Sequence, residues 1–155
     1  MAARIVIADD HEIVLEGIRT LIARAGRDWA ICGEARNGRD AVEMVKTLKP
    51  DIAVLDITMP VMSGLEAAGQ ITSLGLPTRT LIFTMHESER LPTDVRASGA
   101  HGYVHKSQAA RDLIRAIDCL LAGDTFFGAL PEKSKKENEE PNPGSLFCMG
   151  LAFAC

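Results

Sequence analysis

Short apolar runs recur along the first 123 residues, and polar residues or glycine follow most of them. Runs of this length that stay apolar throughout are typical of parallel strands covered on both faces. We therefore expect five strands, at residues 4–8, 29–35, 52–55, 80–83 and 102–104.

Between these runs, apolar residues recur three and four positions apart, which places them along one face of a helix. The stripes predict helices at residues 12–25, 41–48, 65–74, 91–97 and 113–121. Pro92 interrupts the fourth stripe, so we expect that helix to start late or to be irregular. Gly123 is expected to end the last helix.

Strand and helix alternate five times, which predicts the α/β fold class. Right-handed crossovers then give a doubly wound, five-stranded parallel sheet with helices on both faces, a three-layer sandwich. We expect the flavodoxin-like strand order 2-1-3-4-5.

The composition changes after Gly123. Residues 132–143 are rich in charge, asparagine and proline, which is typical of a disordered linker, and residues 146–155 are apolar but short. We therefore expect one domain over residues 1–123 and a linker and tail over 124–155. We hypothesise that the chain after about Leu130 is a frameshifted or artificial end.

Charge and composition exclude several function classes. The net charge is −4 and no helix-turn-helix pattern follows Gly123, so we expect no direct nucleic-acid binding by this chain. No signal peptide or bilayer-length apolar run is evident, so no membrane association is expected. The four cysteines form no C-x-x-C pair, and we interpret them as reduced thiols of a cytoplasmic protein.

Polar residues follow the expected strands at the ends that meet along one edge of a parallel sheet. These residues are Asp9, Asp10, Asp56, Thr84 and Lys106. Like-charged carboxylates about 4 Å apart repel by roughly 4 kcal/mol at an effective dielectric near 20, so a divalent cation is expected among them. Oxygen ligands favour Mg²⁺. A carboxylate beside Mg²⁺ accepts a phosphoryl group, and an amine and a hydroxyl bind its oxygens.

Each of these residues also has a simpler interpretation. Asp9 and Asp10 fit a strand-ending turn with a helix N-cap, Thr84 a strand-end hydroxyl, and Lys106 a solvated charge at a helix start. The four histidines lack metal-ligand spacing, so we expect them at the surface rather than in a metal site.

Four motifs together resemble the receiver domains of two-component response regulators, most closely the NarL/FixJ (LuxR-type) subfamily. They are Asp9–His11, Asp56–Pro60 with Gly64, Thr84–His86 and Gly102–Lys106. The resemblance covers about residues 4–123 and the motifs stand in the family's order.

The resemblance implies roles for individual residues. Asp56 would accept a phosphoryl group from a histidine kinase, Lys106 would bind a phosphoryl oxygen, and Thr84 and Tyr103 would form the switch. Mg²⁺ would be held by Asp9, Asp10, Asp56 and the backbone carbonyl of Thr58. The side chains of Thr58 and His86 would tune dephosphorylation. A homodimer would form through the fourth helix, the fifth strand and the last helix.

Two questions stay open at this point. Haloacid-dehalogenase-type phosphatases also use a strand-end aspartate with Mg²⁺, but their nucleophile usually follows the first strand and a second acid lies two residues later. Here the nucleophile follows the third strand and Thr58 occupies the second position, which disfavours an enzyme. The chain is expected to be either the regulatory part of a transcription regulator or a stand-alone receiver that acts through protein contacts.

Overall fold

Five parallel strands form the centre of the computed structural model, which describes residues 2–86 and 88–127. The strands are β1 (Ala3–Ala8), β2 (Trp29–Ala35), β3 (Ile52–Leu55), β4 (Arg79–Thr84) and β5 (Gly102–His105). Their order across the sheet is β2-β1-β3-β4-β5, and every neighbouring pair is parallel. The fold class and the strand order predicted from the sequence are confirmed.

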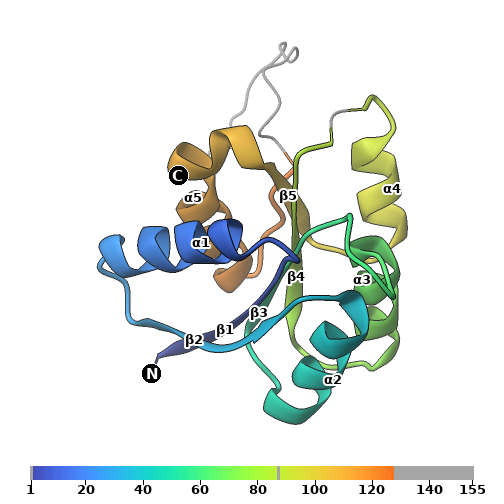
Figure 1. Ribbon diagram of the computed structural model, residues 1–155, viewed down its shortest axis with the longest axis horizontal. Helices are drawn as coiled ribbons and strands as arrows, with labels where there is room; N and C mark the ends of the chain where they lie inside the picture. Colours follow the sequence, from blue (N-terminus) through green and yellow to red (C-terminus); the bar gives the residue numbers. More distant parts are fainter. Residues whose placement is uncertain (1, 87, 128–155) are drawn as a thin grey trace.

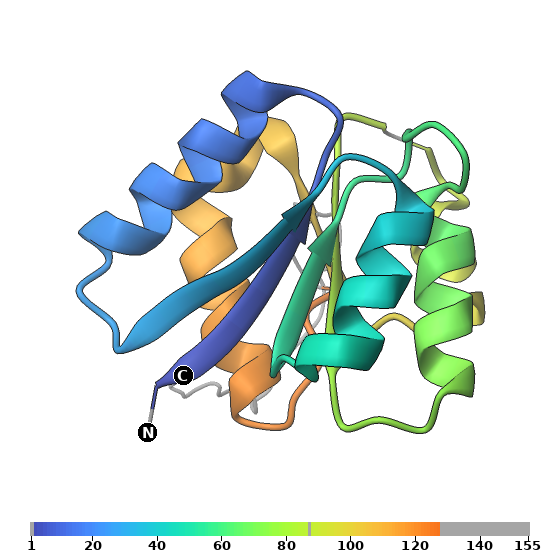
Figure 2. The ribbon, with the colours of Figure 1, turned by 60° about the horizontal axis from the view of Figure 1, so that its bottom comes forward.

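Helices cover both faces of the sheet, as Figures 1 and 2 show. The helices are α1 (Glu12–Arg24), α2 (Gly38–Leu48), α3 (Gly64–Ser73), α4 (Leu91–Ala97) and α5 (Ala109–Leu121). Helices α1 and α5 pack on one face, and α2, α3 and α4 pack on the other. The sheet therefore separates two apolar clusters, one on each face, and its buried strands contribute side chains to both. Within the described ranges, no helix is long and apolar enough to cross a membrane.

Local sequence explains where two of the helices begin. The Asn37 side chain accepts a hydrogen bond from the backbone N–H of Asp40 at 2.8 Å, which caps α2. Ser63 and Glu66 form a reciprocal capping box at the start of α3, with both hydrogen bonds 3.1 Å long. These caps fix the two helices that follow β2 and β3.

Pro92 does not delay or distort α4, contrary to the expectation from the sequence. It lies in the first turn of a helix that spans the predicted residues, Leu91–Ala97. The first turn tolerates proline because its N–H groups have no partner within the helix. A short 3₁₀ helix that the sequence pattern did not predict, η1 (Lys106–Gln108), lies directly before α5.

Packing continues beyond the domain boundary expected at Gly123. Phe126 is buried and pairs with Gly102 in an isolated parallel bridge next to β5. Arg79 donates to the backbone carbonyls of Gly123 and Asp124 at 3.2 and 3.0 Å, which holds the turn after α5. The remainder of the expected tail, residues 128–155, lies outside the described residues.

His101 gives the fold a dependence on pH. Its Nδ1 accepts the backbone N–H of Thr80 at 3.1 Å, and burial, with a contribution from the Arg79 charge, lowers the pKa of His101. The unfolded chain therefore binds a proton near pH 6.5 that the folded chain does not yet bind. Stability conferred by the neutral ring is complete above that pH and is lost as the pH falls below it.

We expect His101→Gln to reduce the loss of thermal stability between pH 7.5 and pH 5, because glutamine keeps an acceptor that does not titrate. Melting temperatures across this range measure the difference, with His86→Gln, a change at an exposed histidine, as the matched control. A wild-type pH profile that His101→Gln leaves unchanged would contradict the assignment.

Candidate functional site

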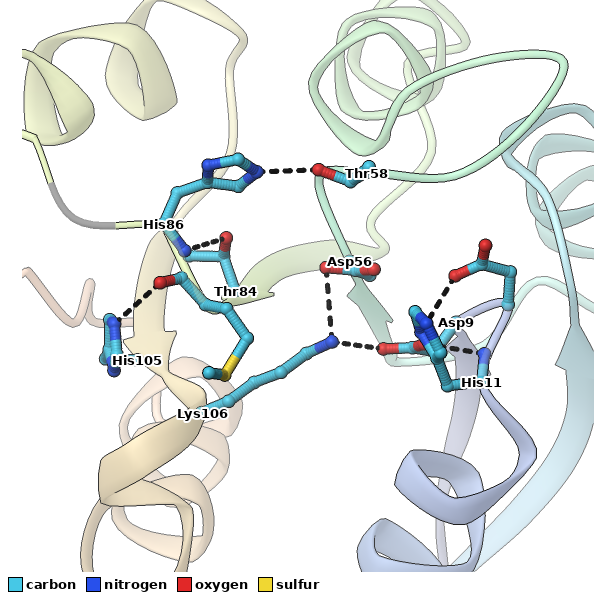
Figure 3. Close-up of polar contacts among 10 residues, drawn as sticks. Asp9, His11, Asp56, Thr58, Thr84, His86, His105 and Lys106 are labelled. Carbon is cyan, nitrogen blue, oxygen red and sulfur yellow. Dashed lines mark hydrogen bonds and ion pairs between the residues drawn. The ribbon is translucent and has the colours of Figure 1, made fainter.

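The sheet register brings the predicted residues to one edge. Ala8 of β1 pairs with Leu55 of β3, so the next residues, Asp9 and Asp56, lie side by side. The backbone N–H of Asp56 donates to the Ala8 carbonyl at 3.0 Å, which extends the pairing to this position. On the other side of β3, strands β4 and β5 deliver Thr84 and Lys106 to the same edge (Figure 3).

Lys106 lies between two carboxylates, as Figure 3 shows. Its Nζ donates to Asp9 Oδ2 at 2.6 Å and lies 3.4 Å from Asp56 Oδ1. The side chain of Lys106 is 10% exposed, and those of Asp9 and Asp56 are 1% and 5% exposed. Lys106 is therefore a largely buried counter-ion of two acids, and its interpretation as a solvated charge is wrong.

The surroundings of Asp56 disfavour its ionised form. Burial raises the pKa of its carboxyl, the Asp9 charge raises it further, and Lys106 lowers it. A smaller contribution from Asp10 also raises the pKa. Excess negative charge at Asp56 is therefore only partly balanced, and a cation bound among these acids would stabilise the ionised form.

The same acids fit a divalent cation. Asp9, Asp10, His11 and Asp56 each offer one ligand atom, and these atoms lie within 4.8 Å of one another. The three carboxylates supply the oxygen donors that Mg²⁺ prefers. Receiver-type use of Asp9, Asp10 and Asp56 as a metal site is thus compatible with their positions.

His11 belongs to this cluster, although the sequence analysis placed it outside any metal site. Its Nδ1 lies 3.1 Å from Asp9 Oδ1 and 3.1 Å from Asp10 Oδ1. Its backbone N–H also donates to Asp9 Oδ1 at 2.9 Å. His11 is the N-cap of α1 without a side-chain cap bond, so the N-cap role considered for the two aspartates is not observed in the described chain.

Thr84, Thr58 and His86 form a second group near Asp56, with Thr58 and His86 above it and Thr84 to its left in Figure 3. The buried hydroxyl of Thr84 accepts the backbone N–H of His86 at 2.9 Å. The ring Nε2 of His86 and the hydroxyl of Thr58 are 2.6 Å apart, within hydrogen-bonding distance. Both Thr58 and His86 are exposed, so their contact bridges the loops that follow β3 and β4 at the surface.

Tyr103 lies deep in the core. The residue is 2% exposed and belongs to the apolar cluster beneath α2, α3 and α4. Its hydroxyl is buried without a hydrogen-bond partner among the described residues. An unpaired buried hydroxyl costs about 1–3 kcal/mol, so favourable ring contacts must offset this cost.

His105 ties the end of β5 to the loop after β4. Its Nε2 is 2.9 Å from the Met85 carbonyl oxygen, and its Nδ1 accepts the backbone N–H of Ser107 at 3.2 Å. These contacts fix the chain just before Lys106. Sequence reasoning gave His105 no role, because the partner at Met85 becomes a neighbour only when β4 and β5 pair.

Comparison with known protein families matches residues 5–118 to the response regulator receiver domain. The chain belongs to the response-regulator receiver family. This receiver is 34% identical over 122 residues to the nitrate/nitrite response regulator protein NarL of Escherichia coli K12, covering 79% of this chain and 56% of NarL. It is 33% identical over 141 residues to a putative transcriptional regulator of Pseudomonas aeruginosa PAO1, covering 88% and 67% of the two chains.

Solved structures agree with this assignment. The receiver superposes with a TM-score of 0.78 and 38% identity on a LuxR-family two-component response regulator from Aurantimonas sp. SI85-9A1, covering 83% of this chain and 91% of that one. For the receiver domain of the putative response regulator NarL from Mycobacterium tuberculosis, the TM-score is 0.75 and the identity 31%, with 79% and 98% coverage.

These matches confirm the resemblance to the NarL (LuxR-type) subfamily and favour a response regulator over a phosphatase. The receiver spans only 56% of the length of two relatives, NarL of E. coli and the regulator YxjL of Bacillus subtilis. Receiver domains of this family take part in phosphorelay signalling.

Proposed function

We propose that this chain is a phosphorylation switch in which Asp56 accepts a phosphoryl group from a histidine kinase. The observation that carries the proposal is the buried triad of Asp9, Lys106 and Asp56, with Lys106 Nζ 2.6 Å from Asp9 and 3.4 Å from Asp56. A carboxylate with an amine and a second acid beside it has the groups that phosphoryl transfer needs. This role explains the arrangement better than a purely structural ion pair does.

In the proposed step, a carboxylate oxygen of Asp56 attacks the phosphorus atom of a phosphohistidine. A P–O bond forms as the P–N bond breaks, and the electron pair of that bond stays on the imidazole of the kinase. The amine of Lys106 then pairs with a phosphoryl oxygen, which charge-assisted hydrogen bonding stabilises. Lys106 reaches the new group by a short movement, because it already contacts Asp56.

Mg²⁺ is the cation proposed for the acidic cluster. Asp9, Asp10, Asp56 and the backbone carbonyl of Thr58 would hold it. When bound, it would neutralise the carboxylates and the negative charge of the incoming phosphoryl oxygens. The close approach of the acidic ligand atoms, within 4.8 Å, supports this assignment.

The proposed switch uses Thr84 and Tyr103, and the lifetime of the phosphorylated state depends on Thr58 and His86. The Thr84 hydroxyl accepts only the His86 N–H among the contacts of the described chain, so its own proton is available for a phosphoryl oxygen. The Thr58–His86 contact of 2.6 Å lies beside Asp56 and would hinder an attacking water.

Partners and output remain predictions. A histidine kinase would be the phosphoryl donor. A second copy would bind through α4, β5 and α5, and the mass in solution would show whether this dimer forms. DNA binding is not expected of this chain itself, so a regulatory role in transcription requires an output domain elsewhere. A cytoplasmic location follows from the same proposal.

The decisive experiment is incubation with acetyl phosphate and Mg²⁺, followed by intact-mass measurement and mapping of the modified residue. The expected result is one labile phosphoryl group on Asp56, which does not form when Mg²⁺ is chelated before the reaction. Modification of a serine, threonine or histidine in place of Asp56 would overturn the proposal.

Mg²⁺ should raise the melting temperature, because it binds the assembled cluster and not the unfolded chain. At about ten times its Kd, the expected stabilisation is about 1.4 kcal/mol. Asp10→Asn should remove most of this increment and raise the stability of the metal-free protein by less than about 1 kcal/mol, since it removes charge near Asp56.

Thermal unfolding with and without Mg²⁺ measures both effects. Glu43→Gln, which removes an exposed acid of α2 paired with Lys46, is the matched control. A Mg²⁺ response that is equal in Asp10→Asn and Glu43→Gln would argue against Asp10 as a ligand.

A further inference from the structure

The ring of Phe127 lies between Tyr103 of β5 and Arg96 of α4. The Tyr103 and Phe127 ring centroids are 6.0 Å apart at an interplanar angle of 63°, an edge-to-face contact. The guanidinium carbon of Arg96 lies over the Phe127 ring, 3.8 Å from its centroid. Phe127 therefore links the tyrosine of the proposed switch to the helix that covers it.

The backbone that carries Phe127 is anchored on the same strand. The N–H of Phe126 donates to the His101 carbonyl, and the N–H of Tyr103 donates to the Phe126 carbonyl, both at 3.0 Å. The Arg115 guanidinium lies 5.9 Å from the centre of the Phe126 ring, which is itself buried. Backbone hydrogen bonds thus join β5 at Tyr103 to the chain that follows α5.

Polar contacts do not explain why Tyr103 is buried. Its hydroxyl has no hydrogen-bond partner in the part of the chain that the structure describes. Burial raises the pKa of this phenol, while the Arg96 charge lowers it. The ring contacts with Phe127 and the apolar cluster are what hold the side chain inward.

We propose that Phe127 and Arg96 are positioning residues that keep Tyr103 in its buried position, and that they couple the segment after α5 to the phosphorylation site. This inference rests on the proposed function, because it makes Tyr103 part of the switch. Tyr103 is held inward before phosphorylation, so phosphorylation stabilises a position that Phe127 already favours.

Coupling of this kind is reciprocal. If Phe127 favours the inward tyrosine, and the phosphorylated site favours it too, removing Phe127 weakens binding of a phosphoryl mimic. Binding of the mimic must in turn restore the inward tyrosine in a variant without Phe127. A contact with only a structural role has no such effect on the distant acidic site.

Tyr103 is the single tyrosine of the chain, so it can be observed alone. Protein labelled with 3-fluorotyrosine gives one ¹⁹F resonance, recorded with and without Mg²⁺ and beryllofluoride, a mimic of the phosphoryl group. We expect Phe127→Ala to move or broaden this resonance, and saturating beryllofluoride with Mg²⁺ to return it to the wild-type position. Beryllofluoride affinity should fall about fivefold.

Further variants separate positioning from general packing. Phe127→Trp keeps an aromatic ring and should restore both readouts, whereas Phe127→Leu should not. Arg96→Ala should reproduce the change in the resonance in part. Leu121→Ala, a change at a partly exposed residue at the end of α5, is the control and should leave both readouts unchanged.

The inference is overturned if Phe127→Ala leaves the tyrosine resonance unchanged. It is also overturned if this substitution changes the resonance without weakening the binding of beryllofluoride. Arg96→Ala offers the same test at an exposed residue, should Phe127→Ala not fold. Failure of the wild-type protein to bind beryllofluoride would count against the proposed function itself, so the two failures are distinguishable.

Discussion

Asp56→Asn is expected to eliminate all phosphorylation by acetyl phosphate. Asparagine keeps the size of the side chain but replaces the attacking carboxylate oxygen by an amide, which is not a nucleophile for phosphorus under these conditions. Intact-mass measurement after incubation with acetyl phosphate and Mg²⁺ checks the result. Asp51→Asn is the matched control, because Asp51 lies just before β3, at the end opposite to Asp56, and its side chain accepts only the backbone N–H of Arg4 among the contacts described.

The same variant is expected to be more stable than the wild type, although it cannot be phosphorylated. Burial and the Asp9 charge raise the pKa of Asp56, so at neutral pH its ionised form destabilises the folded state. Asp56→Asn should therefore melt at a higher temperature than the wild type without Mg²⁺. Undiminished phosphorylation of this variant, or a lower melting temperature, would contradict the assignment of Asp56.

Gly64→Ala is expected to cause the largest loss of stability among single substitutions near the site. A Cβ atom at this position would lie 2.0 Å from the backbone carbonyl oxygen of Asp56, and backbone atoms cannot move aside as a flexible side chain does. We expect a loss of about 3 kcal/mol, which lowers the melting temperature by on the order of 10 °C. Phosphorylation should also slow, since the Gly64 N–H fixes the loop through the Ile57 carbonyl at 2.9 Å.

Gly69→Ala is the matched control for this change. Gly69 lies in the interior of α3, and a Cβ there would meet only the Ser98 carbonyl oxygen at 3.8 Å. Alanine should stabilise the helix by about 0.5–1 kcal/mol, because glycine has more conformational entropy to lose. Equal effects of the two substitutions in thermal unfolding would show that the close approach of Gly64 to Asp56 is unimportant.

Much of the fold could be predicted because the chain carries its strands as continuous apolar runs. The runs at 29–35 and 52–55 coincide with β2 and β3, and the other three strands differ by at most one residue at each end. Helix starts were less predictable. Helix α5 begins at Ala109, four residues before the apolar stripe that indicated it, because its first turn follows η1 and is set by local backbone geometry.

The acids of the site were predictable for a related reason. Parallel strands place their carboxyl ends along one edge, so residues that follow the runs had to meet there. Asp9, Asp56 and Lys106 do meet, through ion pairs of 2.6 and 3.4 Å. His11 was missed because it has neither metal-ligand spacing nor an apolar context, and only the turn after β1 brings its ring to the two carboxylates.

The sequence by itself determined the fold class and the residues that the strands deliver to one edge, because local periodicity and chain connectivity leave few alternatives. Only the tertiary structure decided how Phe127 packs between Tyr103 and Arg96, since these residues belong to different elements. It also decided that Tyr103 is buried with its hydroxyl unpaired within the described chain. Such contacts depend on the distances between packed elements, which no pattern along the chain encodes.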